Sequence, residues 1–202
     1  MKRICLLLCA LALAPTVARA QSYDDVTFTG VKIGASVDYR WQEGDYALPR
    51  IASMLDEKKG GIGYRGHIGY DVQLGNVLVI GGEGGIGRGG GTLKAASTIG
   101  DYALKPRWAW DVSGRVGVLP APRVLLYGRT GYSWLRTRET TDFRATNLAD
   151  VHASSTKSGF LWGGGAEVAL IPGVFTRAEY NRVNYGGGLT SSKVQIGMSI
   201  GF

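Results

Sequence analysis

The chain has 202 residues, a formal net charge of +7, 32 glycines, five tryptophans and two cysteines. Its Lys and Arg residues are scattered without a run of five, so nucleic-acid binding has little support. Abundant glycine, alternating apolar residues and no long stretch of 3.6-residue periodicity predict an all-β protein.

The first 20 residues have the features of a secretory signal peptide. Lys2 and Arg3 precede an apolar run over 4–14, and Ala-Arg-Ala follows at 18–20. The run is too short for a membrane helix, which needs about 20 apolar residues. We therefore predict a signal peptide over 1–20, cleaved before Gln21.

Both cysteines lie inside this segment. Leu7 and Leu8 replace the small residues that a lipoprotein signal at Cys9 needs, so lipidation there is disfavoured. The mature chain then has no cysteine and no disulfide. No shift in composition divides it, which predicts one domain over 21–202.

Period-2 alternation predicts eight strands. In the last of them Val194, Ile196, Met198, Ile200 and Phe202 share one face, up to the end of the chain. The predicted strands are 31–41, 62–74, 77–88, 106–119, 124–136, 159–170, 174–182 and 193–202.

The connections alternate between short and long. Short turns are predicted at 75–76, 120–123 and 171–173, and long loops at 42–61, 89–105, 137–157 and 183–192. An even number of strands with short turns at one end and long loops at the other is typical of outer-membrane barrels. We predict an eight-stranded antiparallel up-and-down transmembrane β-barrel.

A soluble lipocalin-like barrel is the alternative, with the apolar face inside. Eight strands enclose an interior that side chains only just fill, so the many aromatic residues cannot all enter it. They gather instead toward the long-loop ends, as in the aromatic girdle of a membrane barrel. The predicted girdle consists of Trp41, Tyr64, Trp108, Trp110, Tyr132, Trp134, Phe160, Trp162 and Tyr180.

The segment GFLWGGGAEVALIPGVFTRAEYNRVNYGG (159–187) resembles the last hairpin of the small outer-membrane β-barrel proteins. That family includes opacity-type and porin-like surface proteins and is similar in architecture to the OmpA transmembrane domain. The resemblance implies export to the outer membrane of a Gram-negative envelope. It also implies that the outer-membrane assembly machinery recognises Phe202, and that the long loops face outward, where they can meet an extracellular ligand.

The predicted inward face carries seven positive and six negative charges, which nearly cancel. Six of them lie at similar heights on neighbouring strands: Glu83, Arg115, Arg129, Glu167, Arg177 and Glu179. We expect Arg129 to be the centre of a network, with Glu167 on the next strand and Glu83 across the lumen. Unpaired buried charges are costly, so such a network should close the lumen.

Three arginines have outward parity at the level of the aromatic girdle: Arg88, Arg136 and Arg182. Arginine costs little near the membrane interface. We expect these side chains to bind lipopolysaccharide phosphates; solvation among lipid headgroups is an equal alternative.

Catalytic and cofactor signals are weak. His152-Ala153-Ser154, with Glu167 downstream, matches the His-x-Ser pair of some lipid hydrolases, but it falls in a predicted polar loop. His67 shares parity with luminal charges, which favours a hydrogen-bonding role. With two histidines and no mature cysteine, no metal site is expected. The glycine-rich segments have no G-K-[ST] and introduce no helix, so no nucleotide or other cofactor is expected.

The sequence thus predicts a monomeric barrel with a structural or surface-interaction role, surrounded by outer-membrane lipid and lipopolysaccharide and with no enzymatic activity. A small-solute pore is the first alternative and a lipid-modifying enzyme the second.

Overall fold

The computed structural model describes residues 26–48, 53–143 and 151–202, so the predicted signal peptide lies outside the described residues. None of these residues forms a helix long and apolar enough to cross a membrane. They form nine strands: β1 (Gly30–Leu48), β2 (Ser53–Leu74), β3 (Leu78–Gly89), β4 (Leu93–Ala96), β5 (Gly100–Ala121), β6 (Val124–Phe143), β7 (Val151–Ile171), β8 (Val174–Asn184) and β9 (Leu189–Gly201).

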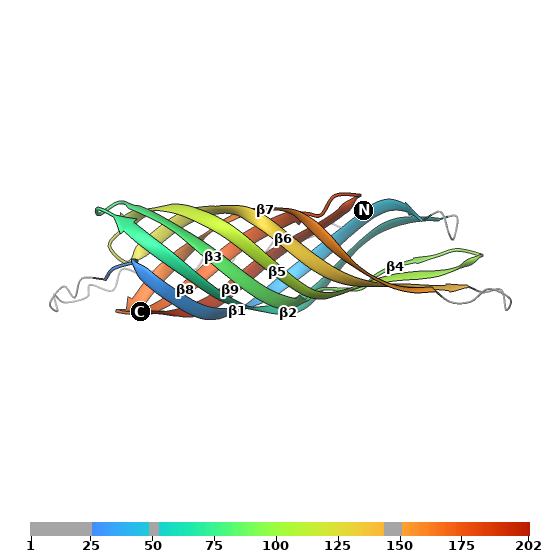
Figure 1. Cartoon of the computed structure of the whole chain (residues 1–202), viewed down its shortest axis with the longest axis horizontal. Coiled ribbons are helices and arrows are strands. Elements are labelled where there is room, and N and C mark those ends of the chain that lie inside the picture. Colours follow the sequence, from blue (N-terminus) through green and yellow to red (C-terminus); the bar gives the residue numbers. More distant parts are fainter. Residues whose placement is uncertain (1–25, 49–52, 144–150) are drawn as a thin grey trace, which may run out of the picture.

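Eight of the nine strands close into a ring (Figure 1). All pairings are antiparallel, in the order β1-β2-β3-β5-β6-β7-β8-β9, and β9 returns to pair with β1. β4 pairs only with the start of β5 and stands outside the ring. The predicted eight-stranded up-and-down barrel is confirmed, and ring closure leaves no unpaired edge at membrane depth.

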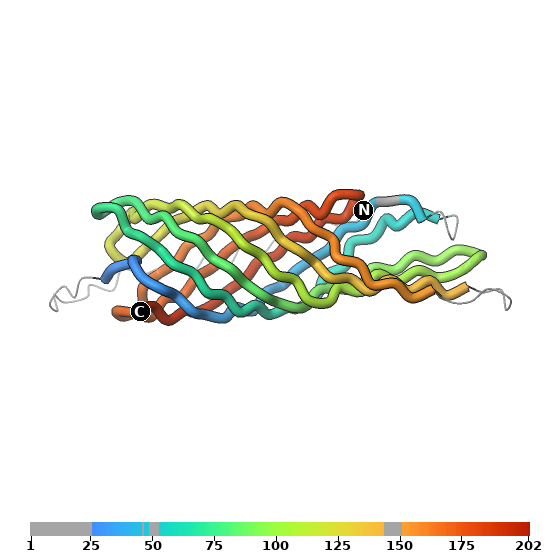
Figure 2. The backbone as a smooth tube through the Cα atoms, viewed as in Figure 1, coloured from blue at the N-terminus to red at the C-terminus, as the bar shows by residue number. Residues whose placement is uncertain are grey.

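The last residue is held by the first strand. The Phe202 amide donates a hydrogen bond to the Val31 carbonyl at 2.9 Å, and the Val31 amide donates to the Phe202 carbonyl at 3.2 Å. Figure 2 shows this end of the chain beside the three short turns and the start of the described residues. Pairing to β1 explains how an alternating strand persists up to the chain end.

The period-2 pattern separates the two faces of the ring. Outward side chains are apolar and highly exposed, as in Ile62 (76%) and Ile196 (67%). Inward side chains of the same strands are polar or charged and buried, as in Asp38 and Arg65. A water-soluble barrel would show the reverse arrangement, so this pattern requires an apolar solvent outside the ring.

The short turns occur as predicted, between β2 and β3, β5 and β6, and β7 and β8. Gly75 and Gly173 adopt φ of 62° and 76°, a left-handed conformation that glycine permits without steric cost. These two positions let the chain reverse within a few residues.

The predicted long loops are different in the structure, because most of their described residues are paired strand. Pairing of β1 with β2 continues to Leu48–Ser53, and pairing of β6 with β7 continues to Thr141–Val151. The hairpin extension is the part that continues beyond the ring: 45–48, 53–60, 93–106, 137–143 and 151–158. Figure 1 shows it at the end opposite the short turns.

Candidate functional site

The lumen contains three layers of inward side chains. The turn-side cluster is apolar and consists of Phe28, Val79, Leu125, Tyr127, Ala169 and Phe175. A charged layer occupies the middle of the barrel. The leucine cluster closes the other end and consists of Leu48, Leu55, Leu93, Tyr102, Leu104, Leu135 and Leu189.

Glu83 on β3 is the carboxylate of the charged layer that three arginines contact. It accepts hydrogen bonds from Arg65 Nη1 at 2.9 Å and Arg177 Nη1 at 2.6 Å. Arg129 Nη1 lies 3.3 Å from the same carboxylate. Three arginines from three strands therefore converge on one buried acid.

Arg129 on β6 links the acids of its own side of the barrel. It donates to Glu179 at 2.7 Å, to Asp111 at 3.0 Å and to the Ser113 hydroxyl at 2.6 Å. Tyr127, two residues earlier, donates to the second oxygen of Glu179 at 2.6 Å. Both oxygens of Glu179 are thus bound.

The expected pair between Arg129 and Glu167 does not form. Glu167 accepts instead from Lys32 and from Arg115 Nη1, the latter at 3.1 Å. The register explains the difference: Arg129 lies opposite Gly163, four residues away from Glu167 along β7. The expected pair would need residues at equal counts from the turns to lie at equal heights, but the strands of a closed barrel are staggered.

All six residues of the predicted network lie inside the barrel and are buried. The six predicted residues do not include Asp71, Arg65 and Asp111, although the inward parity of all three is visible in the sequence. Asp71 accepts from Arg115 and lies 3.0 Å from Lys32, and Asp111 receives two hydrogen bonds from Arg65 at 2.7 and 3.0 Å.

His67 lies in the same layer. Arg177 Nη2 is 2.7 Å from His67 Nε2. Because guanidinium only donates, this ring nitrogen acts as the acceptor. The position fits the hydrogen-bonding role that its parity predicted.

Inward glycines make room for the long luminal side chains. A Cβ atom at Gly85 would lie 2.1 Å from Arg65 Nη2, and one at Gly81 would lie 2.0 Å from Asp71 Oδ1. The glycine-rich run of β3 therefore accommodates the charged layer.

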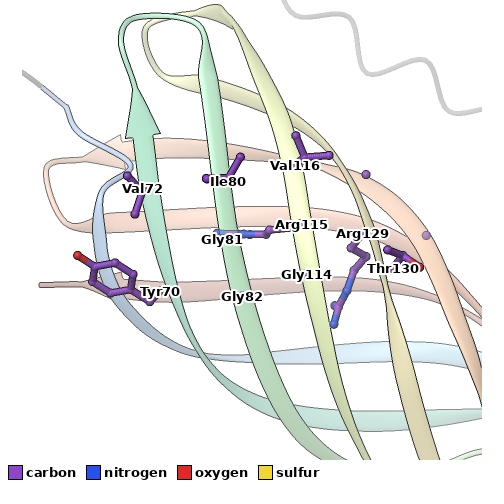
Figure 3. Close-up of a pocket in the computed structure, with 12 residues that line it drawn as sticks. Tyr70, Val72, Ile80, Gly81, Gly82, Gly114, Arg115, Val116, Arg129 and Thr130 are labelled. Atoms are coloured by element: carbon purple, nitrogen blue, oxygen red, sulfur yellow. The ribbon is translucent and has the colours of Figure 1, made fainter.

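Outward glycines leave a shallow groove of about 740 Å³ on the lipid-facing side. Gly82 on β3 lies directly opposite Gly114 on β5, between the larger Tyr70 and Val116. Figure 3 shows these residues with Arg115 and Arg129 beside them.

The predicted aromatic girdle residues all point outward from the ring, and several contact one another. Trp41 lies 6.3 Å from Tyr180, which lies 6.2 Å from Trp162, between ring centroids. Tyr64 meets Trp108 edge-on at 6.4 Å. Further pairs, Tyr132–Trp134 at 5.2 Å and Tyr39–Trp41 at 6.3 Å, lie on neighbouring parts of the circumference.

The three outward arginines lie close to these aromatic residues. Arg88 is directly opposite Trp108 in the sheet, and its guanidinium carbon is 5.7 Å from the centre of that ring. Arg182 lies opposite Trp162. Arg136 is two residues beyond Trp134 on β6 and is exposed.

His152 and Ser154 lie on β7, where the sequence predicted a loop. Both are exposed, and the ring nitrogen Nδ1 of His152 is 3.4 Å from the Thr140 hydroxyl. Glu167 is buried in the lumen with its cationic partners. Across the described ranges no group of three His, Cys, Asp or Glu side chains could hold a metal ion.

Solved structures similar to this chain in fold include those of two proteins. Ail, the attachment invasion locus protein of Yersinia pestis, has a TM-score of 0.55 at 13% identity, covering 86% of this chain and 99% of Ail. The structure of Ail in complex with the heparin analogue sucrose octasulfate has a TM-score of 0.51 at 15% identity, covering 86% of this chain and 99% of that chain. Neisserial surface protein A has a TM-score of 0.51 at 17% identity, covering 86% of this chain and 98% of that chain.

No curated protein sequence matches the chain. A family model described as the outer membrane protein beta-barrel domain matches residues 6–202. This match covers nearly the whole chain. It agrees with the closed eight-stranded ring, its apolar outer surface and its charged interior. The protein therefore belongs to the outer-membrane β-barrel family, and it is located in the outer membrane.

Proposed function

We propose that this protein is a closed barrel that displays a rigid surface for interaction outside the cell. The observation that carries the proposal is the hairpin extension, which continues as paired β-sheet and has an apolar core of its own in the leucine cluster. A barrel that served only as a membrane anchor would not need an ordered sheet beyond the membrane.

One edge of the extension is available for a partner. Between Val151 and Thr156, β7 pairs with β6, but β8 ends at Asn184, opposite Phe160. Within the described part of the chain, the other side of this segment has no strand partner. An unpaired edge can add a strand from another protein. The extension carries both acidic and basic side chains, so a protein partner is favoured over a polyanion such as the ligand of Ail.

The orientation can be tested by labelling single cysteines. Ser154→Cys places a thiol on the extension, and Asn76→Cys places one in a short turn; both native residues are exposed. A membrane-impermeant maleimide should label Ser154→Cys on intact cells and should label Asn76→Cys only after the outer membrane is broken. The opposite result would place the extension in the periplasm and refute the proposal.

The interaction itself can be tested by shortening the β1–β2 hairpin. Joining Gly44 to Glu57 through a two-residue turn removes Leu48 and Leu55 but leaves the ring intact. Cells that express this variant should lose adhesion to host cells or matrix while heat-modifiable mobility shows a folded barrel. Unchanged adhesion would show that the extension is not needed for adhesion.

A non-enzymatic role is part of the proposal. His152 and Ser154 show no mutual hydrogen bond, and Glu167 is engaged inside the lumen by Lys32 and Arg115. Substituting Ser154 with alanine should leave the acyl pattern of lipopolysaccharide unchanged relative to the wild type. A changed pattern would restore the lipid-modifying alternative.

Contact with lipopolysaccharide is the second interaction that we propose. Arg88, Arg136 and Arg182 lie outward beside the aromatic girdle, where guanidinium groups can bind phosphate through two hydrogen bonds. Changing all three to glutamine should weaken lipopolysaccharide binding by the purified barrel. Lys105→Gln, which removes an exposed cation from the extension, is the matched control. Equal binding by the triple variant and the control would exclude the phosphate contact.

A further inference from the structure

An internal cavity lies on the barrel axis between the charged layer and the leucine cluster. Its volume is about 30 Å³, room for one or two particles of the size of water. Every strand of the ring contributes to its wall, and Tyr185, which also packs against the leucine cluster, covers its outer side. The cavity therefore lies at the outer boundary of the charged layer, and the Arg65–Asp111 ion pair forms part of its wall.

The wall of this cavity is rich in cations. Arg40, Arg65 and Lys193 line it, and Asp111 is the one carboxylate among the lining residues. Arg40 and Lys193 lie directly opposite each other on β1 and β9. Like charges in opposite positions of a sheet repel, so the arrangement needs a compensating negative charge.

The nearby carboxylates are already engaged. Both oxygens of Asp38 accept from Arg40, at 2.6 and 2.7 Å. Asp111 accepts two hydrogen bonds from Arg65 and one from Arg129. Neither acid forms an ion pair with Lys193.

Lys193 is the one inward cation without a carboxylate partner among the described residues. Six buried carboxylates face six buried cations, each with an ion pair: Lys32, Arg40, Arg65, Arg115, Arg129 and Arg177. Lys193 is a seventh inward cation. It is half-buried, and among the residues that the structure describes it has neither an ion pair nor a hydrogen-bond acceptor. An ammonium group has three donors, and leaving it unpaired inside a protein is costly.

Hydroxyl groups complete the lining. The Ser133 hydroxyl donates to the Trp110 carbonyl at 3.3 Å, and it therefore accepts from the Tyr185 hydroxyl, 3.2 Å away. We propose that this cavity binds one monovalent anion of halide size, which acts as the counter-ion of Lys193. A larger oxyanion such as sulfate does not fit the volume, and a halide supplies the one negative charge that the lumen lacks.

The site can be tested on the folded barrel in detergent. Urea unfolding is followed in sodium chloride, in sodium bromide and in sodium gluconate at equal ionic strength, gluconate being too large for the cavity. Wild-type protein should unfold at higher urea concentration in either halide than in gluconate. In Lys193→Met this difference should disappear.

Lys32→Met is the matched control, because it also removes a luminal cation but one that lies against the turn-side cluster, over the Phe28 and Phe175 rings. It should be less stable in all salts while it keeps the halide-dependent shift. A shift that persists in Lys193→Met, or one that is absent from the wild type, would overturn the proposal.

Crystals of the wild-type protein grown in bromide give a second readout that does not depend on a variant folding. An anomalous peak should lie in the cavity beside Lys193. A water molecule in its place, without anomalous signal, would show that the cavity is hydrated and would refute anion binding.

Discussion

The membrane-spanning ring and the hairpin extension bury opposite kinds of side chain. Inside the ring are ion pairs such as Arg65–Asp111, and outside are apolar residues such as Ile62. Inside the extension are Leu55 and Leu104, and outside are charged residues such as Lys105. The inward face therefore changes character at the height where the surroundings change from lipid to water.

The physical reason is that lipid tails are as apolar as leucine side chains. In the bilayer, moving an apolar side chain from lipid into the lumen gains nothing, so the ring can hold its interior together with ion pairs. In water each Å² of buried apolar surface contributes about 25 cal/mol, which favours a leucine core in the extension. The following variants test this comparison, from the largest expected effect to the smallest.

Removing the central acid of the ring should have the largest effect. Glu83→Gln leaves Arg65, Arg129 and Arg177 without their shared carboxylate. Removing one partner of a buried ion pair costs about 3–5 kcal/mol, so the free energy of unfolding measured in urea should fall by that amount. Asp56→Asn, an exposed acid in the extension, is the control and should change stability little. Equal effects of the two variants would show that the luminal network does not stabilise the ring.

Truncating the core of the extension should destabilise the extension alone. Leu55 is fully buried, and Leu→Ala at such sites costs about 2–5 kcal/mol. In Leu55→Ala, amide hydrogen exchange should accelerate over 45–48 and 53–60 and stay slow in the ring. Met54→Ala, next to it and 62% exposed, should leave exchange unchanged. Faster exchange throughout the barrel would mean that the two regions fold as one unit.

A pair of double-mutant cycles should distinguish the observed network from the one expected from height alone. Residues in contact couple by about 0.5–3 kcal/mol, whereas residues without shared contacts are additive. Arg129→Met with Glu179→Gln should therefore show coupling, since the two side chains are 2.7 Å apart. Arg129→Met with Glu167→Gln should show weaker coupling, because these two side chains make no direct contact and are linked only through Arg177 and its acids. Stronger coupling in the second cycle would contradict the register of β6 and β7.

The parity of the strands was predictable from the sequence because it depends only on alternation. The charges of Glu83 and Arg177 could be placed inside, and Trp108 outside, without knowing which strands touch. Which charges meet depends on the stagger between strands, and the sequence carries no direct signal for it. For this reason Arg129 could be assigned to the lumen but its partner could not.

The hairpin extension was missed for a different reason. Its segments contain many polar residues, and these were interpreted as loops. Leu93, Tyr102 and Leu104 nevertheless lie at positions that face one another once β4 and β5 pair, and they form part of the leucine cluster. Apolar residues at alternate positions within a polar segment were the available signal that the strands continue into water.

Single-channel recording in planar bilayers tests the central claim, a lumen closed by an ion-pair layer between two apolar clusters. The wild-type barrel should insert without a stable conductance step, because Glu83 and the arginines around it fill the cross-section. A large, steady conductance of the unmodified protein would contradict the closed lumen and would make a small-solute pore the better account.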